Sequence, residues 1–182
     1  MEEESSKFKE ILSWIIYIVA IVAITFFIIT FVGQRTKVSG RSMENTLHDG
    51  DNLIVEKVSY RFREPKRFEI VVFPYRYEED VFYIKRIIGL PGETVQIQDG
   101  DIYIDGEILE EDFGKEIIIE PGIAYQPVTL GEDEYFVMGD NRNNSADSRV
   151  EDVGPIHKDE FVGRAWVRIW PLNKIGVIDH GE

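Results

Sequence analysis

Two runs of alternating apolar and polar residues meet at a turn in Val95-Gln96-Ile97-Gln98-Asp99-Gly100-Asp101-Ile102-Tyr103-Ile104. Such alternation around Asp-Gly predicts a β-hairpin. Other short runs rich in β-branched and aromatic residues lie at 53–55, 70–73, 81–84, 135–138 and 165–170. Between 33 and 182 we find no sustained helical period. The sequence therefore predicts a mainly β fold, an antiparallel barrel or sandwich over residues 33–182.

The segment from 107 to 127 interrupts this pattern. It is more polar and irregular than the predicted strands on either side of it. We interpret it as a small inserted lobe or a mobile loop within the β domain. The chain shows no internal repeat and no low-complexity linker.

A long apolar run, ILSWIIYIVAIVAITFFIITFV, covers residues 11–32 and contains no charged residue, proline or glycine. A helix of this length spans roughly the 30 Å hydrocarbon core of a bilayer. A buried core helix is a weaker alternative, because no face of the run is polar. A cleaved signal peptide is also weaker, because the run is longer than an h-region and no small-x-small site follows promptly. The sequence therefore predicts a transmembrane anchor over 11–32, with a lipid bilayer as partner.

The charges beside this run leave its orientation open. Lys7 and Lys9 precede it, whereas Arg35, Lys37 and Arg41 follow it. Two positive charges against three do not decide the topology by the positive-inside rule.

Composition excludes several classes of function. The formal net charge is −14 at pH 7, and so acidic a chain repels phosphate backbones, which argues against a nucleic-acid partner. The absence of cysteine excludes thiol catalysis and cysteine-ligated zinc. His48, His157 and His180 do not have metal-ligand spacing, so we expect no metal site.

Two residues are candidates for nucleophilic chemistry. Ser42 lies about ten residues beyond the apolar run, in a glycine-containing loop. Alone, it is most simply read as a loop serine. Lys85 stands beside Arg86 in an apolar strand, where burial would lower the pKa of its amine and let it accept a serine proton. The alternative is a lysine whose amine reaches solvent from a strand edge.

The stretch Gly139-Asp140-Asn141-Arg142-Asn143-Asn144-Ser145-Ala146-Asp147-Ser148-Arg149 is dense in polar and charged residues. We expect a hydrogen-bonded loop braced by ion pairs. A calcium loop is the rival interpretation, but it needs oxygen ligands at alternating positions, and Arg142 occupies one of them.

In this order and spacing, the blocks resemble the type I signal peptidases of bacteria, peptidase family S26. The resemblance covers the anchor, Ser42-Met43, the strand 70–73, Lys85-Arg86 with Gly-Leu-Pro-Gly, and the 139–149 loop. It extends to the stretch 162–171, from Val162-Gly163 to Trp170-Pro171, which looks like the last strand of the family. Each block alone is modest, whereas their joint order is highly specific. Gly40 stands where some members carry a second serine, which matches the Gram-positive members.

The resemblance implies a serine endopeptidase with a Ser/Lys dyad and no cofactor. Ser42 matches the nucleophile, Lys85 the general base and Ser145 the hydroxyl that orients the base. The backbone N–H of Ser42 is the expected oxyanion donor. Two ion pairs of the family match Arg86 with Asp140 and Asp147 with Arg149.

The resemblance also implies the substrate and the location. Substrates would be secretory preproteins with small residues at −1 and −3 of their signal peptides, and the translocation machinery would be a further partner. Shallow pockets would be lined by six side chains, those of Val38, Met43, Leu47, Val72, Tyr83 and Ile84. Members of the family span the cell membrane once, which implies a cytoplasmic N-terminus at 1–10 and an extracytoplasmic protease domain at 33–182.

The chain departs from the family pattern at two places, and two rival functions remain. Asn45 replaces a usual proline, which predicts a less rigid loop, and Arg67-Phe68-Glu69 replaces Arg-Gly-Asp. A self-cleaving repressor shares the dyad, but it carries a DNA-binding segment and has no anchor. The other alternative is a membrane-tethered β module without catalytic activity; the joint presence of Ser42, Lys85 and Ser145 argues against it.

Overall fold

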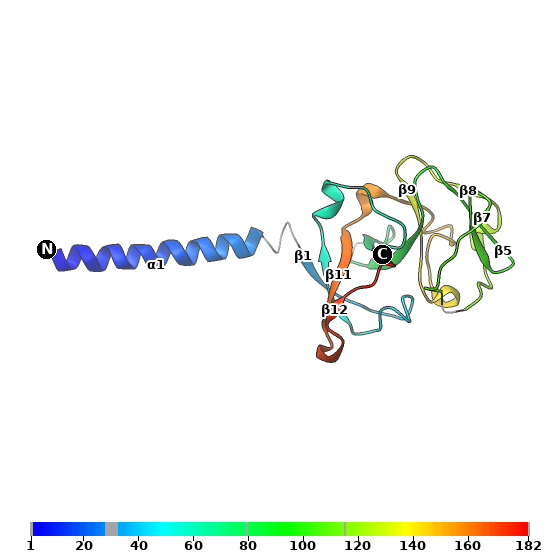
Figure 1. The fold of residues 1–182 in the computed structure, drawn as a ribbon. Helices are drawn as coiled ribbons and strands as arrows, with labels where there is room; N and C mark the ends of the chain where they lie inside the picture. Colours follow the sequence, from blue (N-terminus) through cyan, green and yellow to red (C-terminus); the bar gives the residue numbers. More distant parts are fainter. Residues whose placement is uncertain (1, 28–32, 79, 115, 182) are drawn as a thin grey trace.

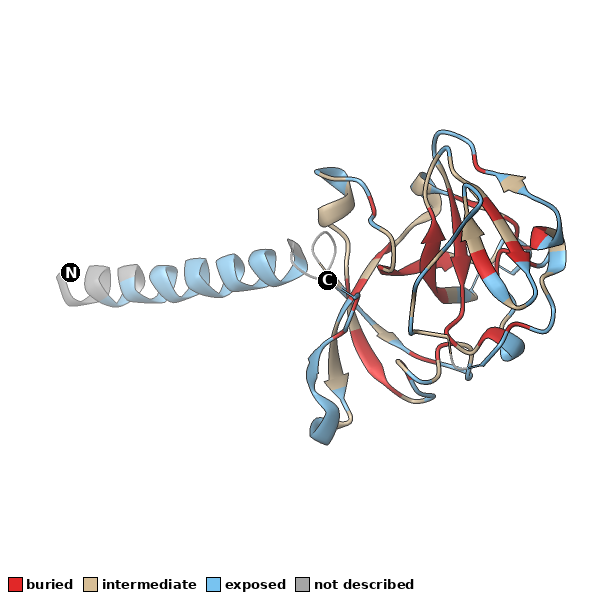
Figure 2. Cartoon of the chain, turned by 45° about the vertical axis from the view of Figure 1, so that its right-hand side comes forward, coloured by how far each residue is buried: buried red, intermediate tan, exposed pale blue. Residues whose placement is uncertain are grey.

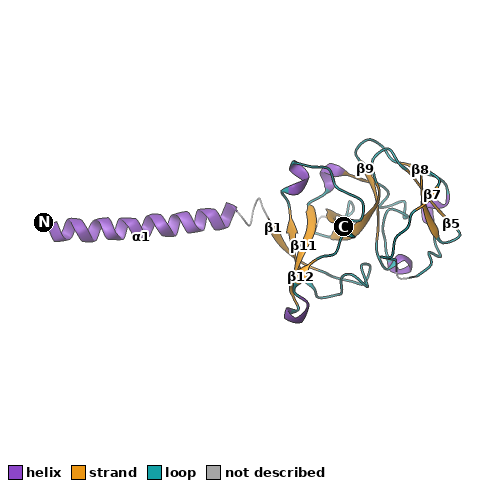
Figure 3. Ribbon diagram, viewed as in Figure 1, coloured by secondary structure: helices purple, strands orange, loops and turns teal. Residues whose placement is uncertain are grey.

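The computed structural model describes residues 2–27, 33–78, 80–114 and 116–181. One helix, α1, covers Glu2–Phe27 and is followed by twelve strands and short 3₁₀ helices. Figure 1 shows α1 projecting away from the strands, and Figure 3 shows that the rest is mostly strand and loop. This confirms the predicted mainly β, antiparallel class.

Helix α1 contains most of the predicted anchor. Its large apolar side chains between Ile11 and Phe26 are exposed, Trp14 and Tyr17 each at 64%. Among the residues that the structure describes, no helix meets the length and apolarity needed to cross a membrane. The transmembrane span predicted over 11–32 is therefore not shown by this structure, and residues 28–32 of that span lie outside the described ranges.

The larger sheet has the strand order β1-β2-β11-β3-β4-β9-β10, with β12 paired to β11. All its pairings are antiparallel. The strands are β1 (Gly33–Lys37), β2 (Asn52–Glu56), β3 (Ile70–Pro74), β4 (Phe82–Gly89), β9 (Glu134–Met138), β10 (Ile156–His157), β11 (Gly163–Trp170) and β12 (Gly176–Val177). Neighbouring strands are far apart in sequence, so this sheet brings the candidate blocks together.

The second sheet has the order β7-β6-β5-β8. Its strands are β5 (Thr94–Gln98), β6 (Asp101–Ile104), β7 (Glu107–Ile108) and β8 (Val128–Thr129). The predicted hairpin is confirmed: Gln98 pairs with Asp101, and Asp99 and Gly100 have φ of 53° and 93°, the left-handed values of a tight turn. The segment 107–127 supplies β7 and one 3₁₀ helix, η3 (Gly122–Tyr125). The other strands of this sheet come from residues before this segment, β5 and β6, and after it, β8.

In the described residues, four 3₁₀ helices besides η3 connect the strands. They are η2 (Ser59–Arg61), η4 (Arg142–Asn144), η5 (Lys158–Glu160) and η6 (Leu172–Lys174). Only short turns of this kind interrupt the β domain in the described residues.

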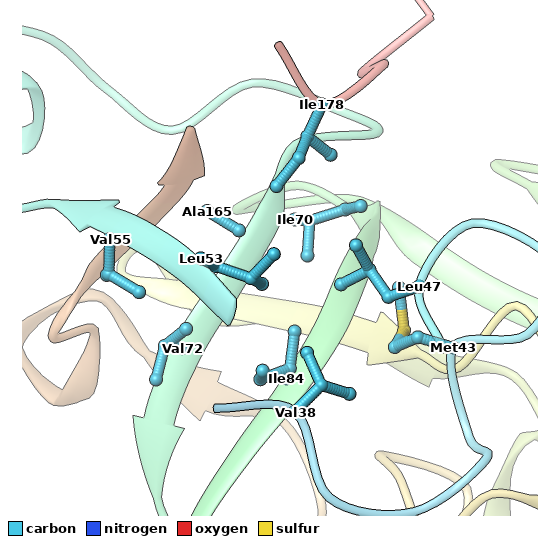
Figure 4. Packing of buried hydrophobic residues seen from close by; sticks show 10 residues of the cluster. All are labelled: Val38, Met43, Leu47, Leu53, Val55, Ile70, Val72, Ile84, Ala165 and Ile178. Atoms are coloured by element: carbon cyan, nitrogen blue, oxygen red, sulfur yellow. The ribbon is translucent and has the colours of Figure 1, made fainter. Parts of the chain in front are cut away.

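Buried side chains gather between the sheets and loops of the β domain (Figure 2) and form three hydrophobic clusters. The first joins β2, β3, β4 and β11 to the loop after β1. Figure 4 shows its members pointing toward one another: Val38, Met43, Leu47, Leu53, Val55, Ile70, Val72, Ile84, Ala165 and Ile178. Because Met43 packs in this cluster, the core fixes the position of its neighbour Ser42.

Candidate active site

Ser42 lies in the loop between β1 and β2, and this loop is closed by its own hydrogen bonds. The Gly40 N–H donates to Asp49 Oδ1 at 2.9 Å, and the Leu47 N–H donates to the Met43 carbonyl at 2.8 Å. The side chains of Met43 and Leu47 are 2% and 0% exposed. The apolar anchors and the closed loop hold Ser42 in place even though Asn45 stands where proline was expected.

Lys85 projects from β4 on the face opposite to Ile84. Side chains alternate along a strand, so Tyr83 and Lys85 share one face, while Ile84 and Arg86 share the other. In the register of β3 and β4, Val71 lies directly opposite Lys85. Both adjacent cations are buried, Lys85 at 3% exposure and Arg86 at 0%. Tyr83 and Val71 therefore lie on the face of the sheet that carries the Lys85 side chain, whereas Ile84 and Val72 project from the other face.

The structure brings Ser42 and Lys85 into contact. Nζ of Lys85 is hydrogen-bonded to Oγ of Ser42 at 2.9 Å and to the Ile84 carbonyl at 3.1 Å. Burial lowers the pKa of the Lys85 amine to about 8; Asp147 and Asp140 oppose this shift, and Arg149 adds to it. A substantial fraction of this amine is therefore neutral near pH 8, as a proton acceptor for serine must be.

The expected oxyanion donor is the backbone N–H of Ser42. Among the hydrogen bonds of the described residues, none uses the Ser42 N–H, whereas the Ser42 carbonyl accepts from the Asn141 N–H at 3.0 Å. The side chain of Asn141 also donates to the Arg41 carbonyl at 3.1 Å. These two bonds attach the serine loop to the 139–149 loop and leave the N–H available to a substrate carbonyl.

Ser145 lies beside the serine loop without contacting the lysine through a hydrogen bond. Its buried Oγ has no hydrogen-bond partner among the described residues. An added Cβ at Gly139 would overlap both Ser145 Oγ and the Ser42 carbonyl oxygen, which shows how closely the three residues approach. The role predicted for Ser145, orienting Lys85, requires a contact that this conformation does not make.

The first predicted ion pair crosses from β4 to the end of β9. Arg86 Nε and Nη2 each donate to the Asp140 carboxylate at 2.8 Å, and both side chains are fully buried. Thr46 donates to the same carboxylate and accepts from Arg86 at 3.2 Å. The centroid of the Phe113 ring lies 3.6 Å from Arg86 Cζ. The pair thus connects the serine loop to the strand that carries Lys85.

The second predicted pair lies within the 139–149 loop. Arg149 Nε and Nη2 donate to Asp147 at 2.8 and 2.9 Å. Asp147 also accepts from the Gly139 N–H at 3.0 Å. Because Arg149 neutralises much of its charge, Asp147 can lie near Lys85 while the lysine pKa stays lowered.

A cleft of about 520 Å³ opens beside Ser42. Among the six predicted pocket residues, Val38, Met43, Tyr83 and Ile84 line it, together with Ser42 and Lys85. Leu47 and Val72 do not line it, because both are buried in the cluster of Figure 4.

Sequence reasoning missed three supporting side chains. Glu69 directly precedes β3, is 1% exposed and pairs with Arg63 and Arg164 at 2.5 and 3.1 Å. Glu111 pairs with buried Arg142 at 2.7 Å, and Thr46 bridges the Arg86 pair. A single sequence carries no signal for such long-range pairs, although arginine close to an apolar strand indicates that a carboxylate must be near.

Known proteins with similar sequences identify the family of this chain. A model of the family described as "Signal peptidase, peptidase S26" matches residues 11–170. The chain belongs to this family. It is 43% identical to a probable signal peptidase I-2 of Synechocystis over 82% of this chain and 68% of that protein. It is 37% identical to a signal peptidase I of Bacillus licheniformis, over 98% of each chain.

A signal peptidase I of Leptolyngbya laminosa is 41% identical over 81% of this chain and 73% of that protein. The resemblance predicted from the motifs is therefore confirmed, including the likeness to Bacillus members. Membership of the S26 family identifies the chain as a serine peptidase and hydrolase. The geometry of Ser42 and Lys85 can now be interpreted as that of a peptidase.

Proposed function

We propose that this protein removes N-terminal signal peptides from secretory preproteins, with Ser42 as nucleophile and Lys85 as general base. The observation that carries the proposal is the 2.9 Å contact between Lys85 Nζ and Ser42 Oγ, made by an amine that is 3% exposed. Family membership supports the same activity. A non-catalytic β module would not need a desolvated amine beside a serine hydroxyl.

The reaction needs only groups that this site contains. Neutral Lys85 accepts the proton of the Ser42 hydroxyl while Oγ attacks the scissile carbonyl carbon. The Ser42 N–H stabilises the oxyanion of the tetrahedral intermediate. Lys85 then returns the proton to the leaving amine, so that the mature protein departs and the signal peptide remains as an ester on Ser42. Lys85 next takes a proton from a water molecule while the water oxygen attacks the ester carbonyl carbon. The bond to Ser42 Oγ then breaks, Lys85 returns the proton to Oγ, and the signal peptide leaves with a free carboxylate.

The cleft is the proposed substrate site. Val38, Met43, Tyr83 and Ile84 leave room for small side chains at −1 and −3, and larger ones would clash with them. We assign Ser145 to the orientation of Lys85 after a change of its side-chain torsion. The ion pairs of Arg86 with Asp140 and of Asp147 with Arg149 would hold the serine loop and the 139–149 loop in fixed positions relative to each other.

We further propose that residues 11–32 anchor the protein in the cell membrane. The apolar, exposed side chains of α1 support this, as does the membrane association of the family. Residues 1–10 would be cytoplasmic, and residues 33–182 would form the extracytoplasmic protease domain, with 107–127 as part of its smaller lobe. The bilayer and the translocation machinery would be its neighbours there.

The test uses the purified full-length chain in detergent and a preprotein with alanine at −1. We expect a single cut directly after that alanine, read by N-terminal sequencing of the product. The matched substrate carries phenylalanine at −1 and should be cleaved at least about a hundredfold more slowly, because the clash costs several kcal/mol. Equal cleavage of both substrates would contradict the proposed specificity.

A further inference from the structure

A group of aromatic rings lies beside Lys85. The rings of Tyr75 and Tyr83 are stacked, with centroids 4.9 Å apart and planes inclined by 15°. Lys85 Nζ lies 4.9 Å from the centroid of the Tyr83 ring. Tyr83 is therefore in contact with the amine and with Tyr75, whereas Tyr75 reaches the amine only through Tyr83.

The strand register explains why these rings meet. Phe73 of β3 pairs with Tyr83 of β4, and the Tyr75 N–H donates to the Val81 carbonyl at 2.8 Å. Tyr75 is thus the diagonal neighbour of Tyr83 on one face of the sheet, within reach of an aromatic side chain. The Phe73 ring meets Tyr83 edge-on, at 6.0 Å and 76°. Two rings from β3 and its turn therefore hold the ring of Tyr83.

Of the two stacked tyrosines, only Tyr75 can be substituted without changing the lining of the cleft. Tyr83 is half-buried and lines the cleft beside Ser42. Tyr75 is half-buried and is not among the residues that line this cleft. Loss of the Tyr75 ring would uncover Tyr83 and free it to move, which would admit water to the amine of Lys85.

We propose that Tyr75 is a positioning residue for Lys85: by stacking on Tyr83, it fixes the ring that shields the amine from water. The inference deepens the proposed function, because it rests on Lys85 being the general base. Stacked aromatic pairs contribute about 0.5–1.5 kcal/mol beyond the area that they bury, enough to hold one ring orientation.

Two effects of the Tyr83 ring oppose each other. A ring face attracts an ammonium group, which favours the charged lysine. The same ring excludes water, which favours the neutral lysine. Desolvation is the largest cause of the lowered Lys85 pKa, so water exclusion dominates. The other charged groups that influence the amine, Asp140, Asp147 and Arg149, would stay in place when Tyr75 is changed.

The experiment compares Tyr75→Ala, Tyr75→Phe and Tyr77→Ala in the full-length chain. Tyr77 is the matched control, because it lies in the same turn, is 70% exposed and meets Tyr75 edge-on without stacking on Tyr83. For Tyr75→Ala, the acid limb of the kcat/KM profile should move up by about one pH unit. Cleavage near pH 7 would then fall by roughly tenfold and recover at alkaline pH. KM should change little, and Tyr75→Phe should restore the profile.

A second measurement separates this inference from the proposed function. The pH dependence of acetylation of the Lys85 amine by limiting acetic anhydride, read by mass spectrometry of the digested protein, reports its pKa without any substrate. The amine of Tyr75→Ala should titrate at higher pH than that of the wild type. If the wild type cleaves no preprotein, the proposed function fails, while the labelling still decides the role of Tyr75.

Overlapping labelling curves for Tyr75→Ala and the wild type would overturn the inference. An equal shift in Tyr77→Ala would overturn it too, because it would point to loosening of the whole turn. Should Tyr75→Ala fail to fold, Tyr75→Leu retains apolar bulk without the ring. Tyr75→Leu should then raise the pKa of the Lys85 amine by less than about one unit. An unchanged pKa would count against the role of the Tyr75–Tyr83 stacking.

Discussion

At the scale of single residues, the proposed chemistry depends on whether one amine is charged. Burial removes water from Lys85 and lowers its pKa, whereas Asp147 and Asp140 raise it, and the balance lies at about 8. An exposed lysine has a pKa of about 10.4 and would be almost fully protonated at neutral pH. The site therefore makes lysine a usable base by placing it where water cannot solvate the ammonium.

This balance predicts the pH dependence of cleavage. Only neutral Lys85 can take the serine proton, so kcat/KM should rise about tenfold per pH unit below about pH 8 and level off above it. In the unfolded chain the amine returns to its higher pKa and binds more protons. Stability should therefore rise, not fall, as pH increases between about 8 and 10. Rates measured with a fluorogenic signal-sequence peptide, alongside thermal unfolding at each pH, check both statements.

A rate that stays flat between about pH 6 and pH 9 would contradict a lysine base, because protonation of a group with pKa near 8 must be visible there. A rate that falls across the same range while the protein remains folded would point to a group that acts in its protonated form.

Much of the site was predictable at this scale, but not its finer geometry. The pairing of Ser42 with Lys85 and both ion pairs were proposed from motif order, and the structure brings these residues together. The conformation and contacts of Phe68 could not be predicted from the sequence. It replaces a usual glycine and has a φ of 69°, a left-handed value that is costly for a residue with a side chain. Its ring packs on Phe113 at 5.2 Å, a contact that no local pattern indicates.

At the scale of elements, the end of β9 packs closely against the serine loop. Gly139 follows Met138 and leaves no room for a side chain beside the Ser42 carbonyl and Ser145. Its N–H also donates to Asp147 at 3.0 Å. The serine loop and the 139–149 loop can approach each other only because glycine stands here.

Gly139→Ala should therefore displace the serine loop. We expect a loss of roughly a hundredfold or more in kcat/KM, because catalysis tolerates little displacement of the reacting atoms. Gly176→Ala in β12 is the control, since its added methyl group would meet no atom within 4 Å and its φ is not left-handed. Activity of Gly139→Ala close to that of Gly176→Ala, measured with the same peptide, would show that the two loops are not coupled through this contact.

The elements were predicted unevenly, for physical reasons. Strands with alternating or continuous apolar residues, such as β3 and the hairpin of β5 and β6, were recognisable. Strand β1 was missed because its sequence, GQRTK, has no apolar pattern and is held by pairing with β2. The two-residue strands β7 and β8 are too short to show a period and exist through tertiary pairing.

At the scale of the whole molecule, the N-terminal helix and the β domain have different environments. The members of the three hydrophobic clusters lie between Val38 and Ile178, so none comes from α1. The apolar side chains of α1 are exposed, and the chain carries a net charge of −14. We therefore expect the acidic domain to remain soluble without the helix, and the helix to partition into lipid or detergent, as proposed above.

Deletion of residues 1–32 should leave a folded, soluble domain. We expect it to unfold within a few degrees of the full-length chain and to cleave a short peptide at a similar kcat/KM, because the core and site remain. Full-length protein should sediment with lipid vesicles, and the truncated protein should remain in the supernatant. Equal sedimentation of both proteins would contradict anchoring by this segment.

In the proposed reaction, Ser42 is activated by Lys85 and cleaves the signal peptide from a preprotein. The most direct test measures preprotein cleavage by the wild type, Ser42→Ala and Ser59→Ala, at equal concentration and with matching circular dichroism spectra. Ser59 lies in η2, outside the cleft, and its variant should keep wild-type activity. We predict that Ser42→Ala loses about 10⁴-fold or more in rate, as expected when a catalytic nucleophile is removed. Cleavage by Ser42→Ala within about tenfold of the wild type would contradict the role of Ser42, because another nucleophile would then be responsible.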